Sequence, residues 1–452
     1  MTALTAASDD SLARLDRLSG LARDVLDQCR ALGASQAEVA LGEDSGLSVN
    51  VRMGEVETVE RTRDRSVGVT VYFGQRKGSA STADLQPASL ASTVQMACAI
   101  ARQTEADPAA GLADADRMAT DLREFDGWHP WALDADRAIA LAVEAEAAGR
   151  AADARIANSD GAGMHSGESV SVYANSHGFV GAERSTSHSL SLSLIAGSGD
   201  AMQRDYWYTS GLSPDDLESP LQVGRRAAER TVARLDPRPI RTGEHPVLFA
   251  PEMARSLIGH LLGAISGGAL YRRASFLLDH AGQRILPPWF NVVERPHIPR
   301  GLRSAAYDAE GVATVDSDIV RDGVLARYLL GSYSARKLGL RSTGNAGGVH
   351  NLEVTANAGD LASIARGMGR GLLVTELMGQ GANTVTGDYS RGAAGFWVEH
   401  GEIAHPVDEL TIAGRLQDLF QAIEAVGSDV DRRSHVGVGS ILVGRMMVAG
   451  EA

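Results

Sequence analysis

The feature that most constrains the fold is an alternation of apolar and polar residues with a period of two, which recurs in the first half of the chain. It occupies four segments: residues 47–51, 67–73, 170–174 and 179–194. Such alternation predicts strands with one buried face, and we expect two strands within 179–194. Glycine-containing turns, Met53-Gly54-Glu55 and Asn175-Ser176-His177-Gly178, separate the runs, so the strands are expected to pair antiparallel.

Helical spacing flanks each group of strands. Apolar residues at three- and four-residue intervals predict a helix over residues 11–32, and Pro87 is placed to begin a second helix. An alanine-rich stretch predicts a third helix over 134–154. The segment 213–216 combines a capping serine, a proline and two acids, which predicts a fourth helix reaching about Leu235. A hairpin sheet followed by a helix is therefore expected twice.

Two stretches without periodicity divide the chain. Residues 105–132 are acidic and contain Trp131 as an expected packing anchor, and Asp236-Pro237-Arg238-Pro239 is the clearest linker. We therefore predict an N-terminal α+β domain over 1–104, a linker and central α+β domain over 105–236, and a β-rich C-terminal domain over 240–452. The fold class is α+β, with antiparallel hairpin sheets and packed helices in the N-terminal half.

The C-terminal region is predicted to be rich in short strands punctuated by glycine. A strand over 246–249 precedes a helix that begins at Pro251, and another helix is expected over 416–426. The other expected strands are 312–315, 324–330, 352–355, 371–376, 394–398, 402–404, 410–412 and 440–443. Such strands indicate a large sheet or a sandwich, whose free edges can hold a partner or an extended peptide.

Charge and cysteine content exclude several classes of function. The chain of 452 residues has 43 basic and 57 acidic side chains, which gives a net charge of −14. Proteins that bind nucleic acids are typically basic, so this charge argues against that function. It also provides no electrostatic attraction to an anionic membrane. No apolar run approaches the roughly 18 residues that span a bilayer. Cys29 and Cys98 are interpreted as reduced thiols in helical stripes. We therefore expect a cytoplasmic protein without direct contact to nucleic acid or membrane.

Common catalytic motifs are missing from the sequence. It contains no H-E-x-x-H, no pair of histidines at i, i+4, no Walker A or G-x-G-x-x-G loop, and no G-x-S-x-G elbow. Ser334-Ala335-Arg336-Lys337 matches S-x-x-K, but its S-D-N and K-T-G companions are missing, so we interpret it as an ordinary helix turn.

The most distinctive stretch is Thr375–Val398, in which glycine recurs inside a β pattern. Within it, Asp388, Tyr389, Ser390 and Arg391 are expected at the tip of a loop. Two interpretations stay open for this loop: a hairpin closed by an Asp–Arg pair, or a contact with a partner or a peptide.

Three segments resemble the PmbA (TldE) branch of the TldD/PmbA family: Gly74–Leu85, Thr386–Gly414 and the tail from Val426. The resemblance extends from about residue 15 to about residue 450. It implies a metal-dependent peptidase that is assembled from TldD and TldE subunits and acts on peptides and unfolded segments. In that family, TldD holds zinc through an H-E-x-x-x-H helix and a later cysteine.

The sequence departs from the TldD pattern where zinc would bind. Arg255 and Ser256 stand in place of the first histidine and the glutamate, only His260 remains, and residues 426–443 contain no cysteine. A lone imidazole beside a guanidinium cannot supply the roughly three protein ligands that catalytic zinc needs. We therefore expect no catalytic and no metal-binding residue in this chain, and we expect the zinc in a TldD-like partner.

The resemblance thus implies a TldE-like subunit that holds no metal and works with a TldD-like metallopeptidase subunit on peptides or unfolded proteins. We expect the chain to be dimeric, with itself or with a TldD-like partner, through the region after Gly243, with residues 388–391 as contacts. Two alternatives stay open: a stand-alone peptide-binding or scaffold protein, and a hydrolase with a non-metal nucleophile.

Overall fold

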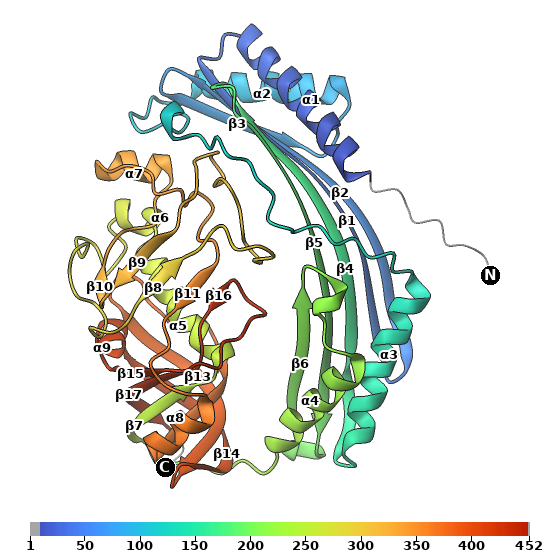
Figure 1. The fold of residues 1–452 in the computed structure, drawn as a ribbon, viewed down its shortest axis with the longest axis vertical. Coiled ribbons are helices and arrows are strands. Elements are labelled where there is room, and N and C mark those ends of the chain that lie inside the picture. Colours follow the sequence, from blue (N-terminus) through green and yellow to red (C-terminus); the bar gives the residue numbers. More distant parts are fainter. Residues whose placement is uncertain (1–9, 451–452) are drawn as a thin grey trace.

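The computed structural model describes residues 10–450, which form two parts (Figure 1). A long curved sheet carries helices on its outer face and arcs around a second, β-rich part. The mixture of helices with these sheets confirms the predicted α+β fold class. No helix among residues 10–450 is long and apolar enough to cross a membrane.

The curved sheet has six antiparallel strands in the order β3-β2-β1-β4-β5-β6. Their bounds are β1 Gln36–Arg52, β2 Glu55–Phe73, β3 Arg76–Thr82, β4 Ile156–Asn175, β5 Val180–Ala196 and β6 Gln203–Gly211. The prediction of two strands within 179–194 is wrong, because the alternation continues without a break through β5 to a turn at Gly197, where φ is +83°. β1 pairs with β4 from Glu38 to Val51, so the strands before and after residue 105 belong to one sheet.

The alternation places the apolar side chains of this sheet on its outer, convex face. One cluster, which includes Val39 and Val172, is buried against α1 (Ser11–Ala31) and α2 (Pro87–Gln103). A second cluster, which includes Leu192, is buried against α3 (Ala135–Ala152) and α4 (Pro220–Ala233). The helices predicted over 11–32, from Pro87 and over 134–154 are confirmed.

The fourth predicted helix is interrupted. Pro214–Asp216 is a short 3-10 turn that Ser213 caps, and α4 begins separately at Pro220 with Ser219 as its N-cap. Proline lacks a backbone N–H and disfavours the helical conformation in the residue before it. A continuous helix therefore cannot pass through Ser219-Pro220.

The β-rich part is built around a closed sheet. Its strands are β7 Gly243–Phe249, β12 Gly371–Met378, β13 Asp388–Glu399, β14 Glu402–Arg415, β15 Ile423–Val426 and β17 Ile441–Ala449, in the order β14-β13-β12-β7-β17-β15. β14 also pairs with β17 through residues 411–413, so the sheet closes on itself. The free edges that we expected in this region are therefore largely paired, which leaves little backbone there to hold an extended peptide.

A smaller sheet and short helices complete this part. The sheet contains β8 Val292–Glu294, β9 Ser317–Arg321, β10 Val324–Leu325, β11 Leu352–Val354 and β16 Val436–Gly437. The helices are α5 Pro251–Ala264, α6 Gly267–Tyr271, α7 Ser332–Leu338, α8 Leu361–Met368 and α9 Leu416–Gln421. One continuous core joins both sheets and α5.

Several C-terminal predictions are wrong in extent. Residues 312–315 form isolated bridges instead of a strand, and the strand expected over 324–330 ends at Leu325. The strands expected over 402–404 and 410–412 are both parts of β14. The helix expected over 416–426 ends at Gln421 and continues as β15, because the apolar residues 423 and 426 pair with β17 in the sheet.

Residues 105–132 connect the two parts of the molecule through several contacts. The backbone N–H of Thr186 in β5 donates to the carbonyl of Gly127 over 3.0 Å, and that of Arg300 donates to the carbonyl of Phe125 over 2.7 Å. The Phe125 ring stacks on His297 with 5.3 Å between ring centroids. The stretch predicted as a linker is therefore packed between the curved sheet and the β-rich part.

The turn between β1 and β2 is fixed to α3 by hydrogen bonds that can be tested by mutation. Glu146 of α3 is 1% exposed, and its carboxylate accepts the backbone N–H groups of Met53 and Gly54 over 2.9 and 2.7 Å. Because Glu146→Gln leaves one of these donors facing an amide N–H, it should lower the free energy of unfolding by about 1–3 kcal/mol. Chemical denaturation measures this loss. Glu144→Gln on the exposed face of α3 is the matched control, and an equal loss there would contradict the assignment.

Candidate functional site

The concave face of the curved sheet is made of small polar residues. Alternate residues of β5 place five serines on it: Ser185, Ser187, Ser189, Ser191 and Ser193. Beside them in register, Ser48, His165 and Ser189 share one row across β1, β4 and β5, and Gly42, Ser171 and Glu183 share another. Such a surface offers hydroxyl, imidazole and carboxylate groups to whatever lies against it, together with the stacked rings of Tyr206 and Tyr208 in register with Ser193 and Ser191.

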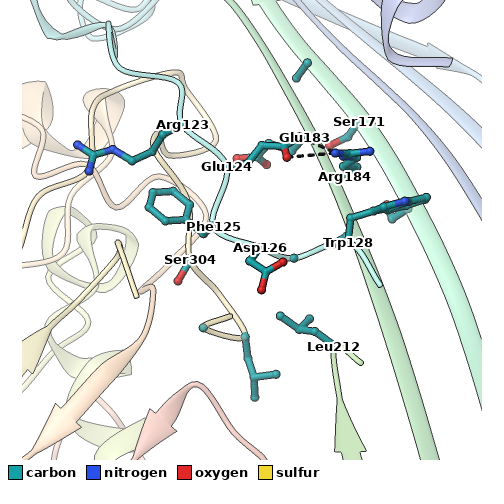
Figure 2. A pocket seen from close by; sticks show the side chains of 16 residues that line it. Arg123, Glu124, Phe125, Asp126, Trp128, Ser171, Glu183, Arg184, Leu212 and Ser304 are labelled. Carbon is teal, nitrogen blue, oxygen red and sulfur yellow. Dashed lines mark hydrogen bonds and ion pairs between the residues drawn. The ribbon is translucent and has the colours of Figure 1, made fainter. Parts of the chain in front are cut away.

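Cavities follow this face into the β-rich part. One of about 250 Å³ lies between the segment 123–128, β5 and residues 301–304 (Figure 2). It shares Ser171, Glu183 and Leu302 with a second cavity of about 410 Å³. The second shares residues 346–349 with a third of about 600 Å³, whose lining includes Leu262 and Gly263 of α5. The cavities therefore form a series that leads from the concave face to the end of α5.

Glu183 lines both of the first two cavities, and its pKa is shifted toward neutrality. Its side chain reaches solvent in the cleft, yet protein surrounds it, and this desolvation raises its pKa to about 7 against a small opposing effect of His350. A carboxyl group with that pKa changes charge near neutral pH. It can therefore give or take a proton, or hold a cationic group, in the cleft.

Arg184, the next residue along β5, is held by residues of the linker. Its guanidinium donates to both carboxylate oxygens of Glu124 over 3.0 and 3.1 Å and lies 5.7 Å from the ring of Trp128. Figure 2 shows Glu183 and Arg184 extending from the strand toward the linker side chains. The ion pair fixes the linker at the mouth of the first cavity.

Two buried carboxylates hold the opposite wall. Glu294, which is 2% exposed, accepts hydrogen bonds from the backbone N–H and the ring of His350 and from the Asn345 amide. Asp308 accepts the backbone N–H groups of Glu310, Val312 and Ala346. The loop 345–350 is thereby anchored at both ends.

These two carboxylates differ in protonation. Burial would raise the pKa of Glu294, but hydrogen bonds from His350 and Asn345 and the charge of Arg327 outweigh it and hold that pKa below the ordinary value. For Asp308, burial prevails over its backbone hydrogen bonds and raises the pKa to about 6. Asp308 therefore titrates close to neutrality, whereas Glu294 stays ionised.

The residues at the degenerate zinc-helix positions lie on α5, and Arg255 is held in an ionic cluster. Its guanidinium lies 3.3 Å from the Asp431 carboxylate and donates to the Tyr208 hydroxyl of β6 over 3.2 Å. Burial would raise the pKa of Asp431, but hydrogen bonds from Arg433 and the charges of Arg433 and Arg255 keep it low. Two guanidinium groups therefore neutralise the acid that lies nearest to this position.

His260 lies away from that cluster, beside β13. Its ring packs edge-on against Tyr389 with 5.6 Å between centroids, and burial together with the charge of Arg391 lowers its pKa. Four buried polar atoms here have no hydrogen-bond partner within residues 10–450: Ser256 Oγ, His260 Nε2, Tyr389 Oη and Arg391 Nε. Ser256 and His260 of the zinc-helix positions therefore lie beside Tyr389 and Arg391 of the segment 388–391, although they form two separate groups in the sequence.

The prediction of a loop tip at residues 388–391 is wrong. All four belong to β13 and pair with residues 412–415 of β14. Tyr389 is 2% exposed, burial raises its pKa to about 12, and Arg391 points toward the same interior. Asp388 accepts a hydrogen bond from the Thr386 hydroxyl instead of pairing with Arg391, and Asp388 and Ser390 are exposed. Alternation along a strand therefore divides the four residues between interior and surface.

The residues present do not fit a zinc ion. Around His260, the neighbours are Ser256, Tyr389 and the cationic Arg391, and the first-ligand position holds Arg255 in its ion pair. Within residues 10–450, no three His, Cys, Asp or Glu side chains are grouped as metal ligands. One neutral imidazole among cations cannot form a zinc site, so no chemical step can be assigned to a metal held here.

The S-x-x-K residues have ordinary structural roles. Ser334 donates to the carbonyl of Gly331 over 3.0 Å, and Lys337 lies 2.8 Å from Asp107 of the linker. Sequence reasoning missed Glu183, Glu294 and Asp308. Glu183 could have been found because it occupies a position in a row of alternate serines, whereas the positions of the two anchors depend on long-range folding.

Comparison with known proteins gives one consistent result. Residues 37–101, 128–235 and 242–450 match domain 1, the central domain and the C-terminal domain of PmbA/TldA metallopeptidases, respectively. The chain is 50% identical to the metalloprotease PmbA of Escherichia coli O157:H7, with 92% of each chain covered. It is also 50% identical to a metalloprotease PmbA homolog of Haemophilus influenzae, with 92% of this chain and 93% of that one covered.

Solved structures share the fold. A Bacteroides thetaiotaomicron protein that carries a DNA-gyrase-modulator name gives a TM-score of 0.91 at 27% identity, over 96% of this chain and 99% of that one. TldE from Thermococcus kodakarensis gives a TM-score of 0.84 at 20% identity, over 95% of this chain and all of that one. The second likeness concerns the fold alone.

Glu183 provides a pH-dependent test of the cleft. Its folded pKa is raised from 4.5 to about 7, so the folded state loses stability relative to the unfolded chain as pH rises between those values. Glu183→Gln removes that loss, and the melting temperature of the variant minus that of the parent should increase from pH 4.5 to pH 7. The matched control is Glu229→Gln on the exposed face of α4, for which the difference should stay flat. A flat difference for Glu183→Gln would contradict the raised pKa.

Proposed function

The chain belongs to the PmbA/TldD metallopeptidase family, and from that premise we propose that it is a subunit that holds peptide without holding the catalytic metal. In this role a TldD-like partner supplies the zinc, and the complex acts on peptides and unfolded segments. The chain alone then carries no catalytic residue.

The observation that supports this role is the chemistry of α5. Arg255 stands at the first zinc-ligand position and is engaged with Asp431 and Tyr208, while the neutral His260 packs against Tyr389. A metal could enter only if the guanidinium left, and it would then find one nitrogen ligand. Arg255 therefore forms a fixed ion pair at the position where a metal ligand would be needed.

The concave face supports peptide holding. Its serines and Glu183 line a cleft that is walled by the loop 345–350 and closed at its mouth by the linker. Hydroxyl groups donate and accept hydrogen bonds with any peptide backbone, so such a face tolerates different side chains. Glu183 can hold an amine or guanidinium group of the peptide. Asp388 and Ser390, the exposed members of their strand, stay proposed contacts with substrate or partner.

A stand-alone peptide-binding protein is the second candidate. It is favoured by the lining of the cavities, which offers hydroxyl and carboxylate groups that can hold a peptide without any metal. The two candidates differ in whether a partner's peptidase activity depends on this chain.

Elemental analysis tests the metal part of the proposal. The purified chain, dialysed against metal-free buffer, should contain well below one zinc per chain. A TldD-like partner with its H-E-x-x-x-H helix, treated in the same way, should retain about one zinc. About one zinc per chain in this protein would contradict the proposal.

Activity in a mixture tests the partner part. Cleavage of an unfolded protein is expected only when both chains are present, and it should disappear when the first zinc histidine of the partner is replaced. Cleavage by this chain alone in excess zinc, or full activity of the partner alone, would refute the subunit role. Peptide binding without any effect on the partner would favour the stand-alone alternative.

We also propose that the chain does not bind DNA directly, whatever the name of its Bacteroides relative. In the basic segment 295–303, two of the three arginines are paired with acids: Arg295 lies near Asp316 and Glu353, and Arg300 lies 2.7 Å from Asp216. With a net charge of −14, few phosphates could be neutralised. A gel shift at physiological salt should show no sub-micromolar duplex binding, and a shift that weakens steeply with salt would overturn this view.

A further inference from the structure

Four polar side chains between α5 and β13 form a group that we call the α5–β13 cluster. They are Ser256 and His260, one turn apart on α5, and Tyr389 and Arg391, two residues apart on β13. Each has a buried nitrogen or oxygen atom without a hydrogen-bond partner within residues 10–450. Buried polar groups are nearly always hydrogen-bonded, because leaving one unpaired costs free energy. Four such atoms in one place therefore indicate a site for a polar ligand.

The charge of this cluster is positive and uncompensated. Arg391 is partly buried, and it forms no ion pair in the part of the chain that the structure describes. Other partly buried arginines do form ion pairs, such as Arg234 with Glu376 and Arg255 with Asp431. A guanidinium keeps its charge when it is buried, and a buried charge without a counter-ion is costly. The missing partner is therefore expected to be an anion.

All four side chains can donate hydrogen bonds. Burial raises the pKa of Tyr389 to about 12, so its phenol keeps the proton at neutral pH. The hydroxyl of Ser256 and the guanidinium of Arg391 are donors, and the neutral ring of His260 can donate from Nε2. A carboxylate only accepts hydrogen bonds and takes several at once, most strongly from a guanidinium. It therefore matches both the charge and the donors of the cluster.

Open space along α5 leads to the cluster. Gly259 and Gly263 stand on either side of His260 in the sequence, and both are exposed. Apart from the helix itself, no atom lies within 4 Å of the point where a Cβ would stand on either glycine. Gly263 also lines the cavity of about 600 Å³. A ligand in that cavity can therefore approach the helix closely beside His260.

We propose that the α5–β13 cluster binds a carboxylate group, and that this group belongs to the peptide held in the cleft. The helix on which a TldD-like chain would hold a cation thus holds an anion in this chain. The assignment to a peptide rests on the proposed peptide-holding role. The binding of a free carboxylate does not rest on it, so the two can be tested separately.

Sodium acetate tests the site in the full-length chain at pH 7 and low salt. A ligand that binds only the folded state stabilises it, so acetate should raise the melting temperature of the parent as its concentration rises. Arg391→Met should raise the apparent dissociation constant for acetate about tenfold or more, and Tyr389→Phe should raise it by a smaller factor. Arg225→Met removes an exposed charge on α4 and should respond to acetate as the parent does.

Stability without acetate separates a binding role from a packing role. Arg391→Met and Tyr389→Phe each remove an unpaired buried group, so without acetate both should be at least as stable as the parent. The parent should become the most stable of the three only when acetate is added. Absence of an acetate effect in the parent, or an equal effect in the parent and both variants, would overturn the proposal.

A pair of peptides tests the source of the carboxylate. A short fluorescent peptide with a free C-terminal carboxylate should bind the parent about tenfold more tightly than the same peptide with a C-terminal amide, whereas Arg391→Met should bind both alike. Equal binding of the two peptides by the parent, with acetate binding intact, would overturn the peptide as the source. Failure of the parent to bind either peptide would instead refute the peptide-holding role, and acetate would still report on the site.

Discussion

The pairing of β1 with β4 is the constraint on which the rest of the structure depends. It joins two hairpin units across a linker of about thirty residues into one sheet, from Glu38 to Val51. Because side chains alternate across a strand, one face of that sheet must be apolar and the other polar. The helices cover the apolar face, and the polar face is left for the cleft. The character of the candidate site thus follows from a backbone pairing far from α5.

A few side chains decide whether the helix at the position of α5 binds zinc or forms an ion pair. A zinc ion would tie this helix to other segments through coordination, whereas here Arg255 ties it to Asp431 and β6. Arg255 shares the Asp431 carboxylate with Arg433, so a network of charges and not a single pair holds this position. The guanidinium therefore both excludes a cation and stabilises the junction between the two parts. In this respect the departure from the TldD pattern is a structural replacement.

Local sequence rules predicted the first half of the fold well and the second half in part. Stripes on α1, α2 and α3 need only neighbouring residues, and those helices formed where expected. Alternation located β1 but not its length, because β1 runs from Gln36 to Arg52 and the predicted strand covered only 47–51. In the C-terminal part, short apolar runs such as 416–426 fit either helix or strand, and tertiary pairing with β17 decided between them. The site was harder to predict, because His260, Tyr389 and Arg391 meet only through the closed sheet.

Edge strands show how differently the two parts treat exposed backbone. The β-rich sheet closes through the pairing of β14 with β17, so its surface can recognise other molecules mainly through side chains. The curved sheet cannot close in this way, since one face must stay open to the cleft. It protects β6 with Arg433 and packs α2 against β3, where Gly78 lets the backbone of α2 approach closely. Within residues 10–450, no strand pairs with the outer side of β2 between Glu55 and Ser66, and a β-bulge interrupts the pairing of this stretch with β1.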